Sequence, residues 1–343
     1  MKRKLEREKK RGVLWGDESG QILVLVAFAA VFLIGMAALA VDVGHGLVVR
    51  NELQNAADAS ALAGAGNLNP SPIPHWALAE SVALSSIAWN QSNGQFLSTC
   101  DPQSGYWNLL RNPAGLRPQG ITPGTQDVPA VMVTVRKVVG QNGGEVPTWF
   151  ARIFGRNSFP VQAQAVAVVS HPGYVTQGPL VPVAIAKELA DQRRYGPGNP
   201  VIIGSAYHYP NSLAGQWTSL LEDRNNVTYL RGLIQNGTPQ QINVGDQIWI
   251  QPGTQNTLYD NRNQPSISWF EGRDVLLPVV NAVLRDTTHA WAPVVGFVGF
   301  HIVSATGGST KTISGYFVDG FTAPNTGGSG PNYGVWTPPH LVL

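Results

Sequence analysis

The sequence is poor in cysteine and in charge. Cys100 is the only cysteine among 343 residues, which excludes an intrachain disulfide, so the fold must depend on its core. We expect Cys100 to be a small buried hydrophobe, with an intermolecular disulfide as the alternative. Charged residues make up only 13% of the chain, and 38 Gly and 25 Pro are present. This balance is more typical of a β-rich protein outside the cytoplasm than of a cytosolic enzyme.

The sequence also lacks the motifs of the common catalytic and metal sites. It has no GxSxG, Walker or HExxH motif, and a single thiol cannot form a CxxC site. The seven histidines have no ligand spacing, and His301 lies in an apolar run, where a satisfied core or edge histidine is expected. No spacing pairs Asp274, Asp286 or Asp319 as catalytic carboxylates. We therefore predict no enzyme activity, no cofactor and no metal.

Basic residues are concentrated at the N-terminus. Residues 1–20 hold seven Lys or Arg and four Asp or Glu, although the whole chain has a net charge of only +2. No basic stripe interleaved with aromatic residues occurs elsewhere, so nucleic acid is not expected as a partner.

What the sequence does have is an uncharged apolar run over residues 22–41, long enough to cross a bilayer. We predict a basic leader over 1–20 and a transmembrane helix over 21–41. The positive flank places the N-terminus in the cytoplasm and the rest of the chain outside the inner membrane. Three fates are open: an uncut anchor, a secretory signal cut after Ala40, or a prepilin-like leader cut between Gly20 and Gln21. Retention of the helix is favoured, because the run is long for a signal and helix-forming residues continue past Ala40.

Residues 42–66 contain no proline and continue this helix as a stalk. Small and apolar residues recur on it and form a candidate helix–helix packing face toward other subunits. The alternative is a helix packed on its own globular domain. Asp42, at the membrane boundary, is expected either among lipid headgroups or paired with a cation of a neighbouring subunit. The packing face comprises Leu53, Ala56, Ala57, Ala61 and Gly64.

The remaining chain predicts two extracytoplasmic units, and the fold class is α+β. Residues 67–175 are expected to form a small α+β unit with a helix over 76–89, a loop over 90–128, strands over 130–139 and 160–170, and a Thr148-capped helix whose aromatic residues are in the core. Residues 176–343 predict a β-rich sandwich or barrel. Its expected strands are 180–186, 200–206, 246–251, 274–284, 292–304 and 311–318.

The segments "SGQILVLVAFAAVFLIGMAALAVDVGH" and "LQNAADASALAGA" resemble the N-terminal module of TadE/TadG-like proteins of the tight-adherence (Flp) pilus assembly system. The segments "PAVMVTVRKVV", "PTWFARIFG" and "FPVQAQAVAVVS" are similar to the periplasmic part of that family. Processed members commonly carry Glu five residues past the cleavage glycine, where this chain has Leu25. The motif-level match covers about half of the chain.

The resemblance implies a membrane-anchored, pilin-like structural component of a pilus assembly or secretion system. Its expected partners are the membrane and other assembly proteins that contact the N-terminal helix, in a homo- or hetero-oligomer. The alternative function is an anchored or secreted surface adhesin that binds a glycan or a protein.

Overall fold

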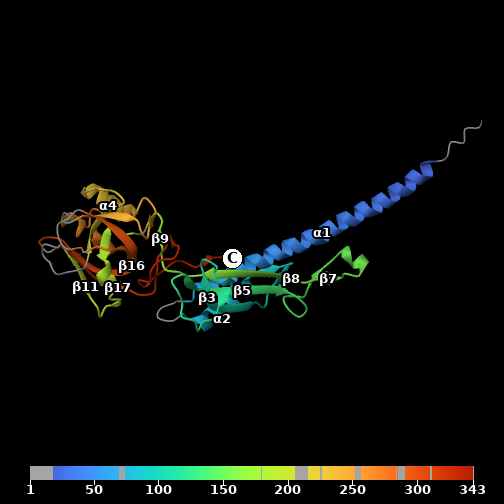
Figure 1. Cartoon of the computed structure of the whole chain (residues 1–343), viewed down its shortest axis with the longest axis horizontal. Coiled ribbons are helices and arrows are strands. Elements are labelled where there is room, and N and C mark those ends of the chain that lie inside the picture. Colours follow the sequence, from blue (N-terminus) through green and yellow to red (C-terminus); the bar gives the residue numbers. More distant parts are fainter. Residues whose placement is uncertain are drawn as a thin grey trace, which may run out of the picture.

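The computed structural model describes residues 18–68, 74–178, 180–204, 215–224, 226–251, 256–282, 284, 290–309 and 311–342. A long helix, α1, projects from a compact helix-and-strand unit, and a second, strand-rich unit lies at the far end of the molecule (Figure 1). The predicted α+β class is confirmed.

Helix α1 is continuous over Glu18–Ala65, which are 48 residues. At 1.5 Å per residue it is about 72 Å long. The large apolar side chains of residues 22–41 are exposed, whereas a stripe of buried residues begins at Asp42. The stripe repeats every three to four residues, so one face of the helix is covered from that point onward. Its members include Asp42, Gly46, Val49, Leu53, Ala57, Ser60, Ala61 and Gly64.

The first unit is a five-stranded antiparallel sheet with helices on one face. The strand order is β21-β8-β5-β3-β4. The second half of α1 packs on β8 and β5, and helix α2 (Trp76–Ser86) packs on α1 and β3. The strands are β3 (Asp101–Asn108), β4 (Leu116–Arg117), β5 (Asp127–Lys137), β8 (Val161–Val168) and β21 (His340–Leu341).

Small residues bring α1 close to this sheet and to α2. Alternate residues of β5, such as Val131 and Val133, share a buried cluster with Leu53 and Ala57 of α1. A Cβ atom built at Gly64 would lie 2.9 Å from the carbonyl oxygen of Ala79 and 3.1 Å from a methyl group of Val131. Glycine is therefore required for the approach of α1 to its neighbours.

The loop predicted over residues 90–128 is wrong in part, because β3 lies within it as an interior strand. The turn-forming residues of this segment favoured the prediction of a loop. Pairing with β5 and β4 on its two sides nevertheless stabilises it as a strand. A Cβ atom at Gly105 would lie 2.1 Å from the carbonyl oxygen of Arg117, so this glycine permits the pairing. The same region holds the 3-10 turn η1 (Ile87–Trp89) and the short hairpin β1 (Gln91–Ser92) and β2 (Gln95–Phe96).

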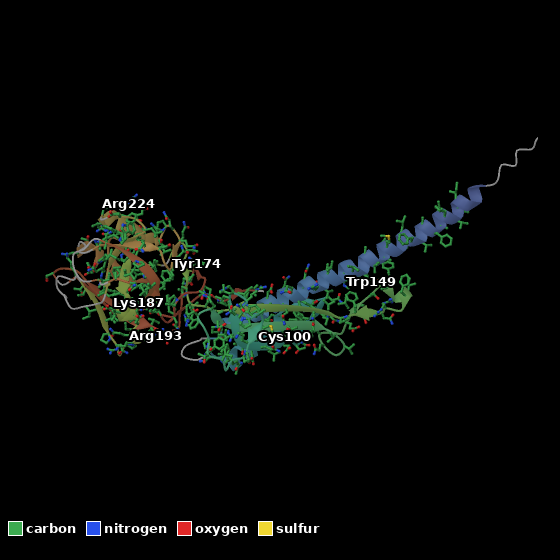
Figure 2. The ribbon with its side chains drawn as sticks, viewed as in Figure 1. Cys100, Trp149, Tyr174, Lys187, Arg193 and Arg224 are labelled. Atoms are coloured by element: carbon green, nitrogen blue, oxygen red, sulfur yellow. The ribbon has the colours of Figure 1, made fainter. Side chains whose placement is uncertain are left out.

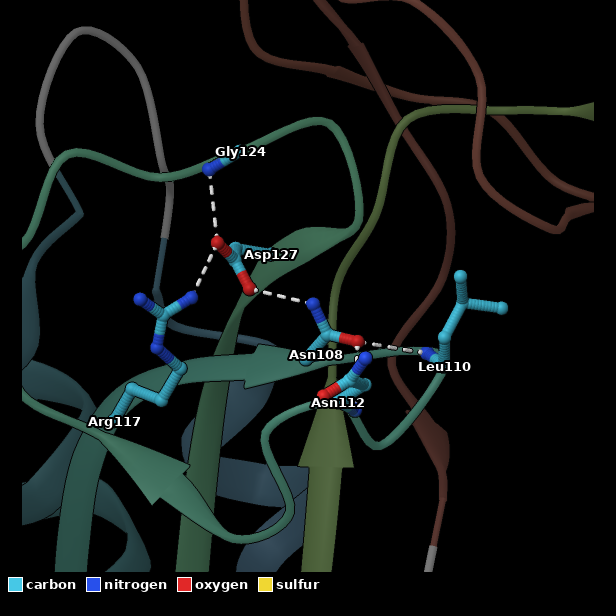
Figure 3. Close-up of polar contacts among 6 residues, drawn as sticks. All are labelled: Asn108, Leu110, Asn112, Arg117, Gly124 and Asp127. Atoms are coloured by element: carbon cyan, nitrogen blue, oxygen red, sulfur yellow. Dashed lines mark hydrogen bonds and ion pairs between the residues drawn. The ribbon is translucent and has the colours of Figure 1, made fainter.

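A polar network fixes the connection that follows β3 (Figure 3). The carboxylate of Asp127 accepts hydrogen bonds from the Gly124 amide at 2.8 Å and the Asn108 side chain at 2.9 Å, and it pairs with Arg117 at 2.5 Å. The side-chain oxygen of Asn108, Oδ1, in turn accepts hydrogen bonds from the backbone N–H groups of Leu110 and Asn112. One buried carboxylate thus organises the loops at this end of the sheet.

The aromatic helix predicted near residues 149–154 is also wrong. The segment is a 3-10 turn, η2 (Ala151–Phe154), at the tip of a hairpin formed by β6 (Val146–Pro147) and β7 (Ser158–Phe159). Thr148 makes no cap, since its hydroxyl donates to the Arg156 carbonyl oxygen instead. Most of the tip's aromatic and aliphatic side chains are exposed, because one turn offers no face to the sheet.

The second unit contains a closed ring of strands. Strands β15, β16, β14, β12 and β10 pair in succession, and β10 pairs back with β15 in parallel. Strands β17 and β11 extend the sheet beyond β16. The sequence left a sandwich and a barrel open for this unit, and the closed ring of strands makes it a barrel. Its strands are β10 (Val183–Ala186), β11 (Val201–Gly204), β12 (Gly215–Leu220), β14 (Gln247–Gln251), β15 (Arg273–Val280), β16 (Ala290–Thr306) and β17 (Thr312–Val318).

The six strands predicted in this unit are all present, with shifted ends, but β12 and helix α4 (Val227–Asn236) were not predicted. Asn226 caps α4 by accepting the Tyr229 amide at 2.6 Å. The smaller elements are β9 (Tyr174–Val175), α3 (Lys187–Ala190), β13 (Ile242–Asn243), η3 (Asn256–Leu258), η4 (Ile267–Phe270), β18 (Phe321–Thr322), β19 (Thr326–Gly327) and β20 (Val335–Trp336).

The chain returns from the second unit to the first. Strand β21 pairs with β8, and the C-terminus lies beside α1 in Figure 1. The Ser170 amide donates to the Thr337 hydroxyl, and the ring of His171 packs on Trp336 with centroids 3.8 Å apart. The connecting segment after β8 is therefore held by the tail, not only by chain continuity.

A first prediction concerns the close packing of α1. Gly64→Ala should lower the free energy of unfolding by about 1–3 kcal/mol, because the new methyl group meets backbone and core atoms. Gly44→Ala is the matched control in the same helix: nothing lies within 4 Å of its Cβ position. That variant should be as stable as the wild type or gain up to about 1 kcal/mol from helix propensity. Thermal unfolding of full-length protein in detergent measures both, and equal effects would contradict the packing described.

A second prediction concerns His171, which hydrogen-bonds the Val335 carbonyl oxygen at 2.8 Å. Burial lowers its pKa from 6.5 to about 4. The unfolded chain therefore binds more protons between these values, and stability should fall as the pH drops from about 6.5 to 4, by on the order of 3 kcal/mol. His171→Phe, which cannot titrate, should flatten that part of the melting-temperature profile. An unchanged slope in the variant would assign the pH dependence to other groups.

Candidate functional site

The apolar half of α1 is uncovered. Every described side chain from Ile22 to Ile34 is exposed, and the run has no acidic or basic residue. The mean hydropathy of an 18-residue stretch of α1 reaches 2.9, and among the described residues α1 alone is long and apolar enough to cross a membrane. Exposed apolar surface of this extent is unfavourable in water and marks a site of contact with lipid or protein.

The boundary between the exposed and docked halves of α1 is Asp42. This residue is only 4% exposed. Its carboxylate accepts the backbone N–H groups of Trp149 at 2.8 Å, Phe150 at 3.0 Å and Ala151 at 2.7 Å. These amides begin the η2 turn and have no helical partners, so Asp42 supplies from another element the cap that the turn lacks.

His45 and Gly46 extend this contact along α1. The His45 ring stacks on Trp149 with centroids 4.8 Å apart, and its Nε2 atom lies 3.0 Å from the Asn93 side-chain oxygen. A Cβ atom at Gly46 would lie 2.6 Å from the Phe159 ring. We call Asp42, His45 and Gly46, with the segments they contact, the collar. It joins α1 to the β6–β7 hairpin, which lies alongside the helix with Trp149 near its end (Figure 2).

Two charged side chains beyond the collar also have hydrogen-bond partners within the chain. The Glu52 carboxylate accepts the Asn93 amide at 2.6 Å. Lys137 is fully buried and donates to the Asn142 carbonyl oxygen at 2.5 Å. The first contact ties the β1–β2 hairpin to α1, and the second ties the end of β5 to the loop that follows it; sequence spacing indicated neither.

The predicted packing face of α1 lies inside the first unit. Its members contact the sheet and α2 of their own chain, so the alternative from the sequence, a helix packed on its own domain, describes this half of α1. The face is accordingly not open to a second subunit in this fold. Leu53, Ala56, Ala57, Ala61 and Gly64 are all buried.

Asp42 has an environment that neither sequence hypothesis described, because its partners are amides of its own chain. Gly20 and Gln21 lie in the first turns of α1, and cleavage between them stays a prediction. Cys100 is half-buried rather than fully buried, with its sulfur 3.7 Å from the Ala83 carbonyl oxygen. Burial raises its pKa to about 11, so the thiol is not activated at neutral pH.

Among the described residues, no group of three His, Cys, Asp or Glu side chains could hold a metal ion. The His301 ring lies 2.7 Å from the Asp274 carboxylate, across the pairing of β15 with β16. His301 also stacks on Tyr316 with centroids 4.8 Å apart. His301 therefore lies on an interior strand, and it has cross-strand partners on both sides.

A comparison with known protein families finds a match for the part of the chain that contains the collar. Residues 42–167 match the family described as "Putative Tad-like Flp pilus-assembly". Over this range the chain is similar to that family, and we call residues 42–167 the Tad-like domain. The resemblance derived from the sequence is confirmed over this range. No curated protein and no solved structure matches the chain.

The ends of the matched range lie at structural boundaries of the first unit. The Tad-like domain starts at Asp42, where α1 becomes buried, and ends at Ala167, one residue before the end of β8. It contains the collar, the packing face and most of the sheet, but not the barrel. The sequence singled out Asp42, yet its partners are 107 to 109 residues away and carry no side-chain signal, because they are backbone amides.

A third prediction tests the collar. In Asp42→Ala the amides of residues 149–151 lose their acceptor, so they should exchange with deuterium at least about tenfold faster than in the wild type. Asp58→Ala is the matched control, since Asp58 accepts only a local hydrogen bond from Gln54 in the same helix. Hydrogen exchange read by mass spectrometry on peptides covering 146–159 makes the measurement. Similar protection in both variants would show that Asp42 does not hold the hairpin.

Proposed function

We propose that this chain is a membrane-anchored, pilin-like structural component of a Tad/Flp pilus assembly or secretion system. The observation that carries the proposal is one helix with two uses. Its first half is bare and apolar, and its second half forms the core of a Tad-like domain. Residues 1–20 lie in the cytoplasm, α1 crosses the inner membrane once, and both folded units lie outside it.

The role is structural rather than catalytic. The family is one of pilus assembly, and the titratable groups of the described collar are engaged in backbone or side-chain contacts that hold elements together. Other assembly proteins are the proposed partners, in a homo- or hetero-oligomer. Since the small-residue face of α1 is used within the chain, their contacts fall on residues 22–41 or on the outer surfaces of the two units.

An adhesin is the second candidate function. Strands β14 and β16 pair Trp249 with Trp291, whose rings are 5.2 Å apart, and Trp291 is exposed on the barrel. The exposed Trp291 ring, backed by the half-buried Trp249, is a surface on which a sugar ring can stack. Binding of a glycan by purified full-length protein without any assembly partner would favour this function.

The test of the proposal combines location with phenotype. The protein should remain in the membrane fraction after alkaline extraction, and intact mass spectrometry should show that residues 22–41 are retained. Protease added outside spheroplasts should digest residues 42–343 while an N-terminal epitope survives. Deletion of the gene should abolish pili or secretion, and the full-length gene should restore them.

Two outcomes would overturn it. A mature chain that begins at Val41 and is found in the soluble fraction would replace the anchored component by a secreted protein. Normal pilus and secretion functions in the deletion strain would remove the assembly role, whatever the location of the protein.

A further inference from the structure

We propose that the tip of the β6–β7 hairpin is a second membrane contact, seated in the interface of the bilayer that α1 crosses. This inference rests on the proposed anchor. It concerns residues 149–154, which we call the interface tip.

The interface tip exposes large apolar side chains that the domain leaves uncovered. Ile153 and Phe154 are 77% and 81% exposed, and Trp149 and Phe150 are 53% and 38% exposed. Four large apolar residues within six positions form a patch that is unfavourable in water.

The position of the tip points to lipid. Asp42 directly follows the apolar run 22–41, and its carboxylate holds the amides of Trp149, Phe150 and Ala151. The tip backbone is therefore fixed at the level where the membrane span ends. Leu39 and Ala151 line the same groove between α1 and the hairpin, which places the tip beside residues of the span itself.

The composition of the tip fits the membrane–water interface. Tryptophan is enriched at this depth, where its ring is partly apolar and its N–H is polar. Arg152 and Arg156, both exposed, lie in and next to the tip and can reach lipid phosphates while the neighbouring apolar side chains enter the acyl boundary. A protein partner would need no such match to the end of the span.

Other exposed apolar residues lie toward the same end of the domain. Val43 and Leu47, on the outer face of α1, are about half exposed beside the collar. Trp89 and Phe96 flank the β1–β2 turn, whose Asn93 contacts His45 and Glu52. The end of the domain that faces the span is thus apolar over several elements.

Two membrane contacts, α1 and the interface tip, would fix the orientation of the domain. A single helix leaves the domain free to rotate about the helix axis, whereas a second contact off that axis fixes one side of the domain against the bilayer. The barrel, at the far end, is then presented in one orientation.

The test uses the full-length chain with Cys100→Ser, which removes its only cysteine. Single cysteines are placed at Ile153 in the tip, at Ile34 in the span, and at Leu110, which is 72% exposed at the other end of the sheet. Each is labelled with a polarity-sensitive fluorophore. The protein is reconstituted into phosphatidylcholine and phosphatidylglycerol vesicles that carry doxyl-labelled lipids as quenchers.

The label at 153 should be quenched at least about twofold more strongly than the label at 110, and most strongly by a doxyl group near the headgroup. The label at 34 should be quenched best by a doxyl group deep in the acyl chain. Quenching at 34 with none at 153 would overturn this inference alone. No quenching at 34 would overturn the anchor and the proposed function. If the emission of the label at 153 instead shifted toward that of an apolar environment as the protein density rose, without quenching by doxyl lipid, the tip would be in contact with another copy of the chain.

Discussion

The surface of α1 changes at Asp42 from apolar side chains exposed all around the helix to a single buried stripe. The rest of the structure depends on the position of this change. Over residues 22–41, α1 presents apolar side chains on every side, which suits lipid and no folded core. From Asp42 onward only one stripe is buried, and small residues on it let the sheet and α2 approach. The Tad-like domain is thus assembled around the second half of α1.

Asp42 marks this change because a carboxylate suits neither lipid nor a dry core unless its charge is satisfied. Three backbone amides satisfy it, and they belong to a hairpin that would otherwise have a bare turn. The same contact therefore ends the lipid-compatible part of the helix and positions the hairpin. His45 and Gly46 extend the contact through a stacked ring and a close approach.

Sequence patterns predicted the features that depend on local chemistry. The continuity of α1 follows from apolar and helix-forming residues without proline, and the barrel strands follow from β-branched runs. Strand β3 was missed because pairing on both sides overrides its Pro102 and Gly105. The exposed tip was misread because aromatic residues are usually buried, and the cap of its turn comes from a residue far away in the sequence. The small residues of α1 that the sequence singled out as a packing face are buried against the sheet and α2 of the same chain.

Strand β21 has a consequence for the order in which the molecule matures. Without His340 and Leu341, β8 would be an unpaired edge of the first sheet, open to pairing with other chains. The residues that cover this edge are synthesised after the whole barrel. During synthesis from the N-terminus onward, β8 therefore stays an unpaired edge until the barrel has been made, and pairing of β21 with that edge is among the last steps of folding.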